Sequence, residues 1–366
     1  MKKKTVKAKA KVDPKAIAFL RQLIETPSPS GFEAPVQEVV RERMKTFTDD
    51  LETDVHGNVI GRLNRGAPLR VMLAGHCDEI GFVVQHIDDK GFLYLLPIGG
   101  IDLSIMPGRR VLVHTAKKKI TGIFGKKPIH LMSPEDRRKV PKAHELWVDI
   151  GAKDKKNAAK NVEIGDVVTV DQGLERLNNN LAVSRAFDDK IGVFVIVEAL
   201  KRLSKGKNLA VEVAAVSTVQ EEIGLRGAKT SAFSIKPHVG IAVDVGFASD
   251  QPGAEKKIVG DVTLGGGPIL HKGANINPTV GRLLVECAKK KKIPYQMTAE
   301  ARATGTDANV IQISRTGVAA ALIGIPTRYM HTPSEMISLD DVENAIELLK
   351  AFISSLKPKM DFTPRP

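Results

Sequence analysis

Two adjacent glutamates, Glu221 and Glu222, follow an apolar run at 209–216. The alternation and the β-branched residues of that run predict a buried strand, which is expected to end where the glutamates stand. Neighbouring residues on a strand point to opposite faces. We therefore expect the two carboxylates to have different functions.

Polar residues also stand beside other predicted strands and at the start of a long predicted helix. In α/β sheets, ligands bind at the carboxyl ends of the strands. Imidazole and carboxylate groups around an open position are the ligand mix of a catalytic zinc-type centre. Five segments supply such groups: "AGHCDEIG" with His76 and Asp78, "SRAFDDKIG" with Asp188, "QEEIG" with the two glutamates, "AVDVG" with Asp244, and "MHTPSE" with His331.

Each segment taken alone has a plainer interpretation. A lone histidine is rarely a ligand, and Asp188 and Asp189 could simply cap their helix. Asp244 is more informative, because a carboxylate that ends an apolar strand needs a partner. The joint occurrence of these segments at strand ends is hard to explain as solvated surface. The remaining histidines are expected at the surface or in turns: His56, His86, His114, His130, His144, His238 and His271.

The elements that would position these groups follow from hydrophobic periodicity and turn signals. Helical periodicity covers four stretches: 14–25, 33–47, 189–203 and about 339–356. Compact apolar strands are predicted at 71–75, 209–216, 239–245 and 318–323. The stretch "DVHGNVIGRL" predicts a hairpin with Gly57 and Asn58 in its turn. Helices alternating with apolar strands are typical of an α/β fold.

Between about 80 and 170 the pattern changes to short alternating runs separated by Gly and Pro turns. Such evenly spaced short runs are typical of a small β-barrel or sandwich. One short helix is expected within this region, with Ser133 as its N-cap and Pro134 at its first helical position.

The order of the five segments resembles metallopeptidase family 42, the glutamyl, deblocking and TET aminopeptidases, in the wider clan of two-zinc aminopeptidases. The segments that carry the resemblance read "H-x-D-E-I-G", "F-D-D-K-I-G", "Q-E-E-I-G", "D-V-G" and "H-T-P-S-E". The similarity extends over nearly the whole chain beyond the first 12 residues, including "GKKPIHLMSPEDRRKV" and "ELWVDIGA".

The resemblance implies two divalent metal ions per chain, with zinc or cobalt expected. It implies that His76, Asp188 and Asp244 hold one ion. Asp188, Glu222 and His331 would hold the other, so that the Asp188 carboxylate bridges the pair. Glu221 would be the general base that acts on a metal-bridging water. Sites of imidazole and carboxylate ligands also accept manganese, so the native metal stays open.

Asp78 is implied to orient the His76 ring, and the residue spacing agrees with that role. The two residues are two positions apart and so share a strand face, whereas Cys77 points away and is expected to be a core thiol. A carboxylate behind a ligating histidine fixes its tautomer and raises its basicity. The sequence departs from the family in having Lys190 where arginine is usual, and Cys77 where a residue such as methionine is usual. The Lys190 ammonium is a point charge and cannot form a bidentate pair.

The expected fold is α/β, a mixed-sheet catalytic domain like that of the two-zinc aminopeptidases, with a small β-barrel inserted in it. If His76 and Asp188 share a metal, the chain between them must leave the core and return. We therefore predict a basic tail at 1–12, a catalytic domain formed by 13–78 and 176–366, and an inserted β-barrel at 79–175, which the resemblance implies is a dimerisation domain. The resemblance implies a homo-oligomer in which dimers assemble into a tetrahedral dodecamer.

Composition excludes several other classes of protein. The net charge is +13, but six of the lysines lie in residues 1–12, and no zinc-finger spacing or RNP-type motif occurs. No nucleic-acid partner is expected. No apolar run approaches the roughly 20 residues that span a bilayer, so no membrane partner is expected. The two cysteines offer no disulfide framework, and the N-terminus lacks the apolar region of a signal peptide. A cytoplasmic location is therefore predicted.

The predicted function is a two-metal aminopeptidase that removes N-terminal residues from short peptide substrates. One alternative is an endoglucanase-like glycoside hydrolase, since two carboxylates could serve there. Sugar-binding platforms need aromatic rings, however, and this chain has one Trp, three Tyr and 4% aromatic residues. The other alternative is a non-catalytic assembly protein with the same fold.

Two further segments are expected to have structural roles near the site. "LGGGP" at 264–268 lacks the Gly-Lys-Ser/Thr of a phosphate loop and is expected to form a tight turn beside the substrate pocket. In "ATGTDANVIQ", Thr306 is expected to be the N-cap of a helix, with Asp307 following it.

Overall fold

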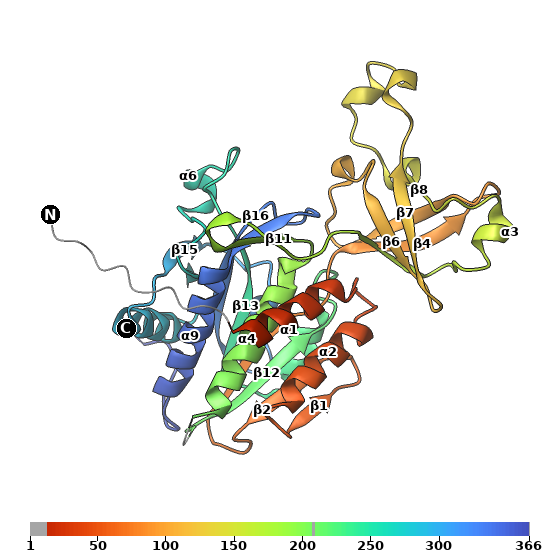
Figure 1. The fold of residues 1–366 in the computed structure, drawn as a ribbon. Coiled ribbons are helices and arrows are strands. Elements are labelled where there is room, and N and C mark those ends of the chain that lie inside the picture. The colour runs from red at the N-terminus through yellow and green to blue at the C-terminus, as the bar shows by residue number, and fades with distance from the viewer. Residues whose placement is uncertain (1–12, 207–208, 366) are drawn as a thin grey trace.

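A computed structural model describes residues 13–206 and 209–365. The predicted basic tail at 1–12 lies outside these residues. The described chain forms a large α/β body and a β-barrel that projects from it as an arm (Figure 1). Within the described ranges, no helix is long and apolar enough to cross a membrane.

The large body is built on an 11-stranded mixed sheet. Nine of its strands lie in the order β1 (Leu51–Thr53), β2 (Val59–Leu63), β12 (Glu212–Thr218), β3 (Arg70–His76), β13 (Val239–Phe247), β16 (Ala319–Arg328), β17 (Glu335–Ser338), β11 (Leu181–Ser184) and β10 (Glu175–Arg176). A short branch adds β14 (Ile269–Gly273), which pairs with β16, and β15 (Gln296–Glu300), which pairs with β14.

The centre of the sheet is parallel, and this brings the predicted strand ends together. Strands β12, β3, β13 and β16 are parallel neighbours, with Thr218 opposite His76. Because parallel strands end at the same edge of a sheet, the segments after them meet there. The prediction of an α/β fold with a mixed sheet is confirmed.

Helices cover both faces of the sheet, and the two-residue period of the strands divides the core accordingly. Val71 and Leu73 belong to the larger core, whereas Met72 and Ala74 of the same strand belong to a smaller one. The larger core is covered by α1 (Pro14–Glu25), α2 (Ala34–Lys45), α4 (Phe187–Ser204), α7 (Pro278–Lys291) and α9 (Leu339–Ser355). The smaller core is covered by α5 (Arg226–Ile235) and α8 (Asp307–Gln312).

The arm is a closed antiparallel barrel inserted between β3 and β10. Its strand order is β4 (Gly81–Ile87), β5 (Leu93–Ile98), β8 (Trp147–Asp149), β7 (Lys119–Gly125), β6 (Arg110–His114) and β9 (Val167–Val170). The barrel has its own hydrophobic core, which includes Phe82, Phe124 and Val148. The short helix α3 (Lys155–Ala158) precedes β9. The predicted inserted barrel is therefore present.

The prediction of a short helix after Ser133 is wrong in the extent of the helix. The chain forms only a 3-10 turn at Asp136–Arg138, although Ser133 Oγ does accept the Asp136 N–H at 3.1 Å. The nearby Ile129 and Leu131 are 56% and 68% exposed. Because this segment has no apolar face buried against a neighbour, the capping signal is not supported by packing and no α-helix extends from it.

The strand before the two glutamates also differs from its predicted limits. It begins at Glu212 and continues to Thr218, so Glu221 and Glu222 lie beyond its end in a turn. Gln220 has a left-handed φ of 55° at the start of this turn. The two side chains separate because of the turn, and not because of the alternation of a strand.

Candidate active site

All the predicted site residues meet at the carboxyl-terminal edge of the parallel strands. His76 is the last residue of β3, and Asp244 lies within β13. Asp188 stands at the start of α4, where its backbone dihedrals are not helical. The remaining residues lie in the turns that follow strands: Asp78 after β3, Glu221 and Glu222 after β12, and His331 after β16.

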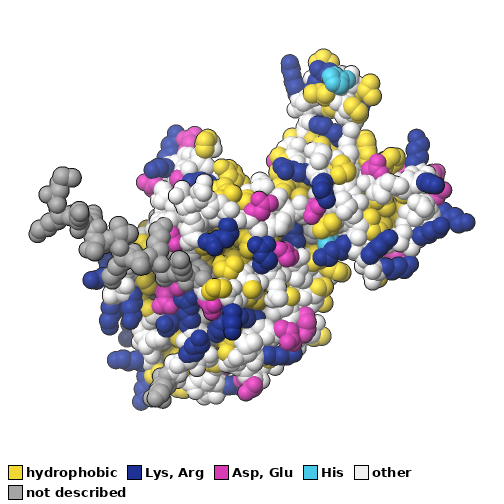
Figure 2. Space-filling model, viewed as in Figure 1, with side chains coloured by type: hydrophobic (Ala, Val, Ile, Leu, Met, Phe, Trp, Pro, Cys, Tyr) yellow, Lys and Arg dark blue, Asp and Glu magenta, His cyan; other side chains and the backbone are white. Residues whose placement is uncertain are grey.

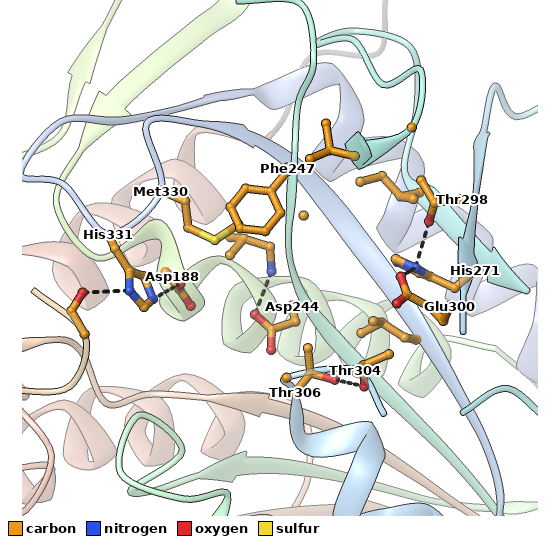
Figure 3. A pocket seen from close by; sticks show the side chains of 18 of the residues that line it. Asp188, Asp244, Phe247, His271, Thr298, Glu300, Thr304, Thr306, Met330 and His331 are labelled. Carbon is orange, nitrogen blue, oxygen red and sulfur yellow. Dashed lines mark hydrogen bonds and ion pairs between the residues drawn. The ribbon is translucent and has the colours of Figure 1, made fainter. Parts of the chain in front are cut away.

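Asp188 lies between the two histidines and directs one carboxylate oxygen toward each. Its Oδ1 is 3.2 Å from His76 Nε2. Its Oδ2 is 3.1 Å from His331 Nε2, a contact that Figure 3 shows. The two glutamates face different histidines. Glu221 Oε2 is 3.6 Å from His76 Nε2, whereas Glu222 Oε2 is 3.7 Å from His331 Nε2. This separation agrees with the expectation that the glutamates have different functions.

The inserted barrel contributes a contact to the site. The carbonyl oxygen of Gly100, in the loop after β5, is 2.9 Å from His331 Nδ1. A proton on Nδ1 would be donated to this carbonyl, leaving the Nε2 lone pair directed toward Asp188 and Glu222. The neighbouring Gly99 is so close to Glu222 that a Cβ there would be 3.2 Å from Glu222 Oε2.

The close packing of buried carboxylates perturbs their protonation. Burial raises the pKa of Glu221 to about 10 and that of Glu222 to about 8, and nearby carboxylates add to both shifts. Burial also raises the pKa of Asp244 well above its usual value. Burial opposes ionisation of Asp188 as well, but its hydrogen bonds with His331 and His76 outweigh burial and hold its pKa below the usual value. Hydrogen bonding to Asp188 raises the pKa of His331 to about 9.

This set of donors fits divalent cations. Two groups have candidate ligand atoms that all lie within 4.8 Å of one another: His76 with Glu221 and Asp244, and His76 with Asp188 and Glu222. In addition, Glu222 Oε1 is buried without a hydrogen-bond partner among the described residues. A cation among these carboxylates would relieve their mutual repulsion and satisfy that oxygen.

Asp78 connects the histidine to the glutamate turn. Its carboxylate accepts the N–H groups of Glu221 and Glu222 at 3.0 and 3.2 Å, and the Ser30 hydroxyl at 2.7 Å. The nearest acceptor to His76 Nδ1 is the backbone carbonyl of Asp78 at 3.1 Å, with the carboxylate at 3.5 Å. Asp78 therefore contacts the ring through both its backbone and its side chain.

Two further buried carboxylates hold the backbone of site residues, and sequence reasoning assigned them no such role. Glu335 accepts the N–H groups of Asp188 and His331, both at 3.0 Å. Asp189 accepts the His76 N–H at 3.1 Å. Burial raises the pKa of both carboxyl groups well above the usual value. The "HTPSE" segment contains Glu335, but nothing in its spacing indicates which distant N–H groups it binds.

Lys190 belongs to a buried ion-pair cluster behind the site. Its ammonium group donates to Glu79 at 2.7 Å and to the Thr26 carbonyl at 2.6 Å, and Arg185 also pairs with Glu79. Burial lowers the pKa of Lys190 to about 8. Cys77 is fully buried in the main core, as the sequence predicted.

A cavity of about 980 Å³ extends from the carboxylate cluster. Asp188 and His331 line one end, and His271, Thr298 and Glu300 form the opposite wall (Figure 3). His76, beside Asp188, also lines the cavity. The prediction that His271 is a surface or turn residue is therefore wrong, because it lies within β14 and is only 9% exposed. His114 was also expected at the surface, but it is 6% exposed at the end of β6.

The two segments expected to be structural lie near this cavity. Asp341 in the first turn of α9 accepts the N–H groups of Gly265 and Gly267, both at 2.7 Å, which confirms the tight turn at "LGGGP". Thr306 is at the N-cap position of α8 but makes no capping bond with its side chain. Its Oγ1 is instead 2.9 Å from Thr304 Oγ1 on the cavity wall (Figure 3).

The chain is similar to known proteins over nearly its whole length. A lysyl aminopeptidase from Pyrococcus furiosus is 39% identical over 349 residues, which cover 94% of this chain and 99% of the relative. The family model of the M42 glutamyl aminopeptidases matches residues 57–348. The chain belongs to the M42 aminopeptidase family. It is therefore a hydrolase that acts as a metal-dependent aminopeptidase.

Solved structures share the same fold over nearly the whole chain. A TET aminopeptidase from a marine sediment Thaumarchaeota archaeon has a TM-score of 0.89 at 34% identity, covering 94% of this chain and 97% of that one. The TET1 peptidase of Pyrococcus horikoshii, which can assemble into a tetrahedron or a large octahedral shell, has a TM-score of 0.83 at 32% identity, covering 93% and 100%. A Thermotoga maritima structure named as an endoglucanase has a TM-score of 0.74 at 31% identity, covering 91% and 96%.

Proposed function

We propose that this M42 aminopeptidase uses two metal ions to remove N-terminal residues from short peptides, with Glu221 as the general base. The observation that carries the proposal is the position of Asp188. Its two oxygens face His76 and His331 separately, so one carboxylate can serve two ions. Zinc or cobalt suits the mixture of imidazole and carboxylate donors.

The proposed ligands divide into two sets that share Asp188. His76 and Asp244 would complete one set, and Glu222 and His331 the other. A competing arrangement would place Glu221 on the ion held by His76 and Asp244, because these three residues also lie close enough to share one ion. We prefer Glu221 as the base because Asp188 already provides the shared carboxylate, which leaves Glu221 without a required ligand role.

Bound divalent ions would polarise the scissile carbonyl and make water more acidic. Glu221 would take a proton from the attacking water and deliver it to the leaving amine. Asp78 would hold the backbone of this glutamate in place through the Glu221 N–H. The free α-amine of the substrate would bind at the ligand cluster, which restricts cleavage to N-terminal residues.

We also propose that the protein forms homodimers through the barrel and that these dimers assemble into a tetrahedral dodecamer. The support is the similarity to the TET1 peptidase, whose tetrahedral assembly is known, together with the projecting arm (Figure 1). A cytoplasmic location is proposed with it, since Cys77 and Cys287 are both unpaired thiols.

The glycosidase alternative has a named relative but little support from the site. Two histidines in the carboxylate cluster have no role in a two-carboxylate glycosidase. Phe247 is the single Phe, Tyr or Trp among the described residues that line the cavity, whereas sugar sites are built on aromatic platforms. A non-catalytic role is opposed by the presence of every proposed ligand and of the base.

Two measurements on the intact protein test the proposed function. Metal analysis after purification is expected to give about two transition-metal ions per chain. A peptide with an N-terminal leucine should lose residues from its N-terminus. Its N-acetylated form should be cut far more slowly, because acetylation removes the free α-amine that the site would bind. Rapid internal cleavage of the acetylated peptide, or hydrolysis of a β-glucan, would refute the proposal.

A further inference from the structure

Glu335 is a buried acid that lies behind the carboxylate cluster and joins two of the proposed metal ligands. It is the first residue of β17 and is 1% exposed. Its Oε2 accepts the Asp188 N–H and its Oε1 accepts the His331 N–H, both at 3.0 Å. Glu335 is not among the described residues that line the cavity of about 980 Å³. It can therefore act on the site only through the residues that it holds.

Strand β17 gives this carboxylate a fixed position. The strand pairs with β11 on one side, where Glu335 lies opposite Ser184, and with β16 on the other. The two N–H groups belong to irregular backbone instead. Asp188 has non-helical dihedrals at the start of α4, and His331 has a left-handed φ of 59° between β16 and β17. A residue other than glycine keeps such a conformation only where its surroundings hold it.

His331 depends on such contacts more than the proposed ligands that lie on strands. His76 and Asp244 belong to the central strands β3 and β13. The His331 side chain, by contrast, is 37% exposed and projects from a turn. Glu335 holds its backbone, and the Gly100 carbonyl of the barrel loop is 2.9 Å from its ring Nδ1. Together these two contacts fix the direction of His331 Nε2.

We propose that Glu335 is a positioning residue for one of the two proposed metal ions. This ion is the one assigned to Asp188, Glu222 and His331, so the inference rests on the proposed two-metal function. The effect of Glu335 falls mainly on this ion because His331 is a ligand of this ion alone. The other ion keeps its two ligands on β3 and β13. Substitution of a residue that orients a ligand typically weakens metal binding by about tenfold to a hundredfold.

Glu335→Gln tests this role with little change in the shape of the side chain. An amide has one acceptor oxygen, so the N–H of either Asp188 or His331 would face an NH₂ group. The intact protein is freed of metal with a chelator and titrated with zinc, and the bound zinc is counted. Wild-type protein should bind about two zinc ions tightly. Glu335→Gln should bind about one tightly, and the other about tenfold to a hundredfold more weakly.

Combination with ligand variants identifies which ion Glu335 supports. Glu222 is assigned to the same ion, so Glu335→Gln with Glu222→Gln should still bind about one zinc ion tightly. Asp244 is assigned to the other ion, so Glu335→Gln with Asp244→Asn should bind neither ion tightly. The reverse pattern would overturn the inference, because it would assign Glu335 to the wrong ion.

Asp341→Asn is the matched control. Asp341 is also a buried acid whose two oxygens each accept a backbone N–H, those of Gly265 and Gly267. None of these three residues lines the cavity. The control should lower resistance to denaturant as Glu335→Gln does, yet bind both zinc ions like wild type. Loss of a zinc ion from the control, or full retention of both ions in Glu335→Gln, would overturn the inference.

Hydrogen exchange of the wild-type protein provides a second test, which needs no variant to fold. The acceptor of the His331 N–H is Glu335 and not a metal ion, so this N–H should exchange slowly in the metal-free protein as well. Rapid exchange of this N–H while the β-sheet stays protected would overturn the inference. Wild-type protein that binds only one zinc ion tightly would instead refute the proposed two-metal function, whatever the exchange rate of this N–H.

Discussion

Glu221 and Glu222 are adjacent in sequence, yet their carboxylates face His76 and His331 respectively. Asp78 holds both of their N–H groups, so a single buried carboxylate sets the positions of the proposed base and a proposed ligand. The roles proposed for the two glutamates can be tested separately by substitutions that preserve the shape of the side chain and remove its charge.

Glu221→Gln should retain about two metal ions per chain and lose roughly 10²–10⁴-fold or more in turnover, because only proton transfer is removed. Glu222→Gln should bind one ion weakly, since a neutral oxygen donor replaces an anionic one, and added metal should restore part of the activity. Metal analysis and turnover of both variants make the comparison. Loss of metal from Glu221→Gln with full retention in Glu222→Gln would mean that the two roles are reversed.

The residues of the carboxylate cluster could be found from the sequence because each stands beside a buried strand or at the start of a helix. The residues that sequence analysis did not predict form hydrogen bonds with residues that are distant in the sequence. Glu335 binds the N–H of Asp188, and Asp189 binds the N–H of His76. His271 was missed because it lies on β14, a short strand whose pairing with β15 cannot be read from periodicity.

Strand and helix positions were predicted well where packing and periodicity agree. Helix α1 has the predicted limits, whereas the strand expected at 209–216 begins three residues later and ends two residues later, at Glu212–Thr218. The segment after Ser133 had a correct capping signal but no buried face, and it forms only a 3-10 turn. Local sequence signals therefore predicted where helices and strands occur, and tertiary packing determined how far each of them extends.

Strand β6 of the barrel ends at a buried histidine that should make stability depend on pH. His114 accepts or donates a hydrogen bond with Thr169 at 2.8 Å, and its Nδ1 is buried without a partner among the described residues. Burial, aided by Arg185, lowers its pKa from 6.5 to about 4. The folded state thus favours the neutral ring. Its contribution to stability is complete above pH 6.5 and is lost as the pH falls toward 4.

Between about pH 7.5 and pH 5, this residue should account for a loss of about 2 kcal/mol in the free energy of unfolding. His114→Gln keeps a polar partner for Thr169 but cannot be protonated, so the variant should lose less stability over that interval. Denaturant unfolding of both proteins at the two pH values measures the difference. An identical pH dependence in the variant would show that His114 is not responsible, and His130→Gln at an exposed site is the control.

At the scale of the whole molecule, the arm carries apolar side chains that are exposed to water when the chain is alone. The extension between β7 and β8 exposes Ile129, Leu131 and Val140, which are 56%, 68% and 66% exposed. Figure 2 shows hydrophobic side chains among basic ones at the outer end of the arm. Apolar residues grouped on a projecting segment indicate a contact surface, and the proposed occupant is a second copy of the chain.

Ile129→Asp combined with Leu131→Asp should therefore weaken assembly, because it would bury unpaired charges in the contact. Sedimentation velocity should show the intact protein as a large oligomer and the double variant as smaller species, with metal content unchanged because neither residue lines the cavity of the site. Val55→Asp is the matched control, since Val55 is fully exposed on the large body, and it should assemble normally. An intact protein that sediments as a monomer, or a double variant that assembles like the control, would show that this part of the arm does not form the contact.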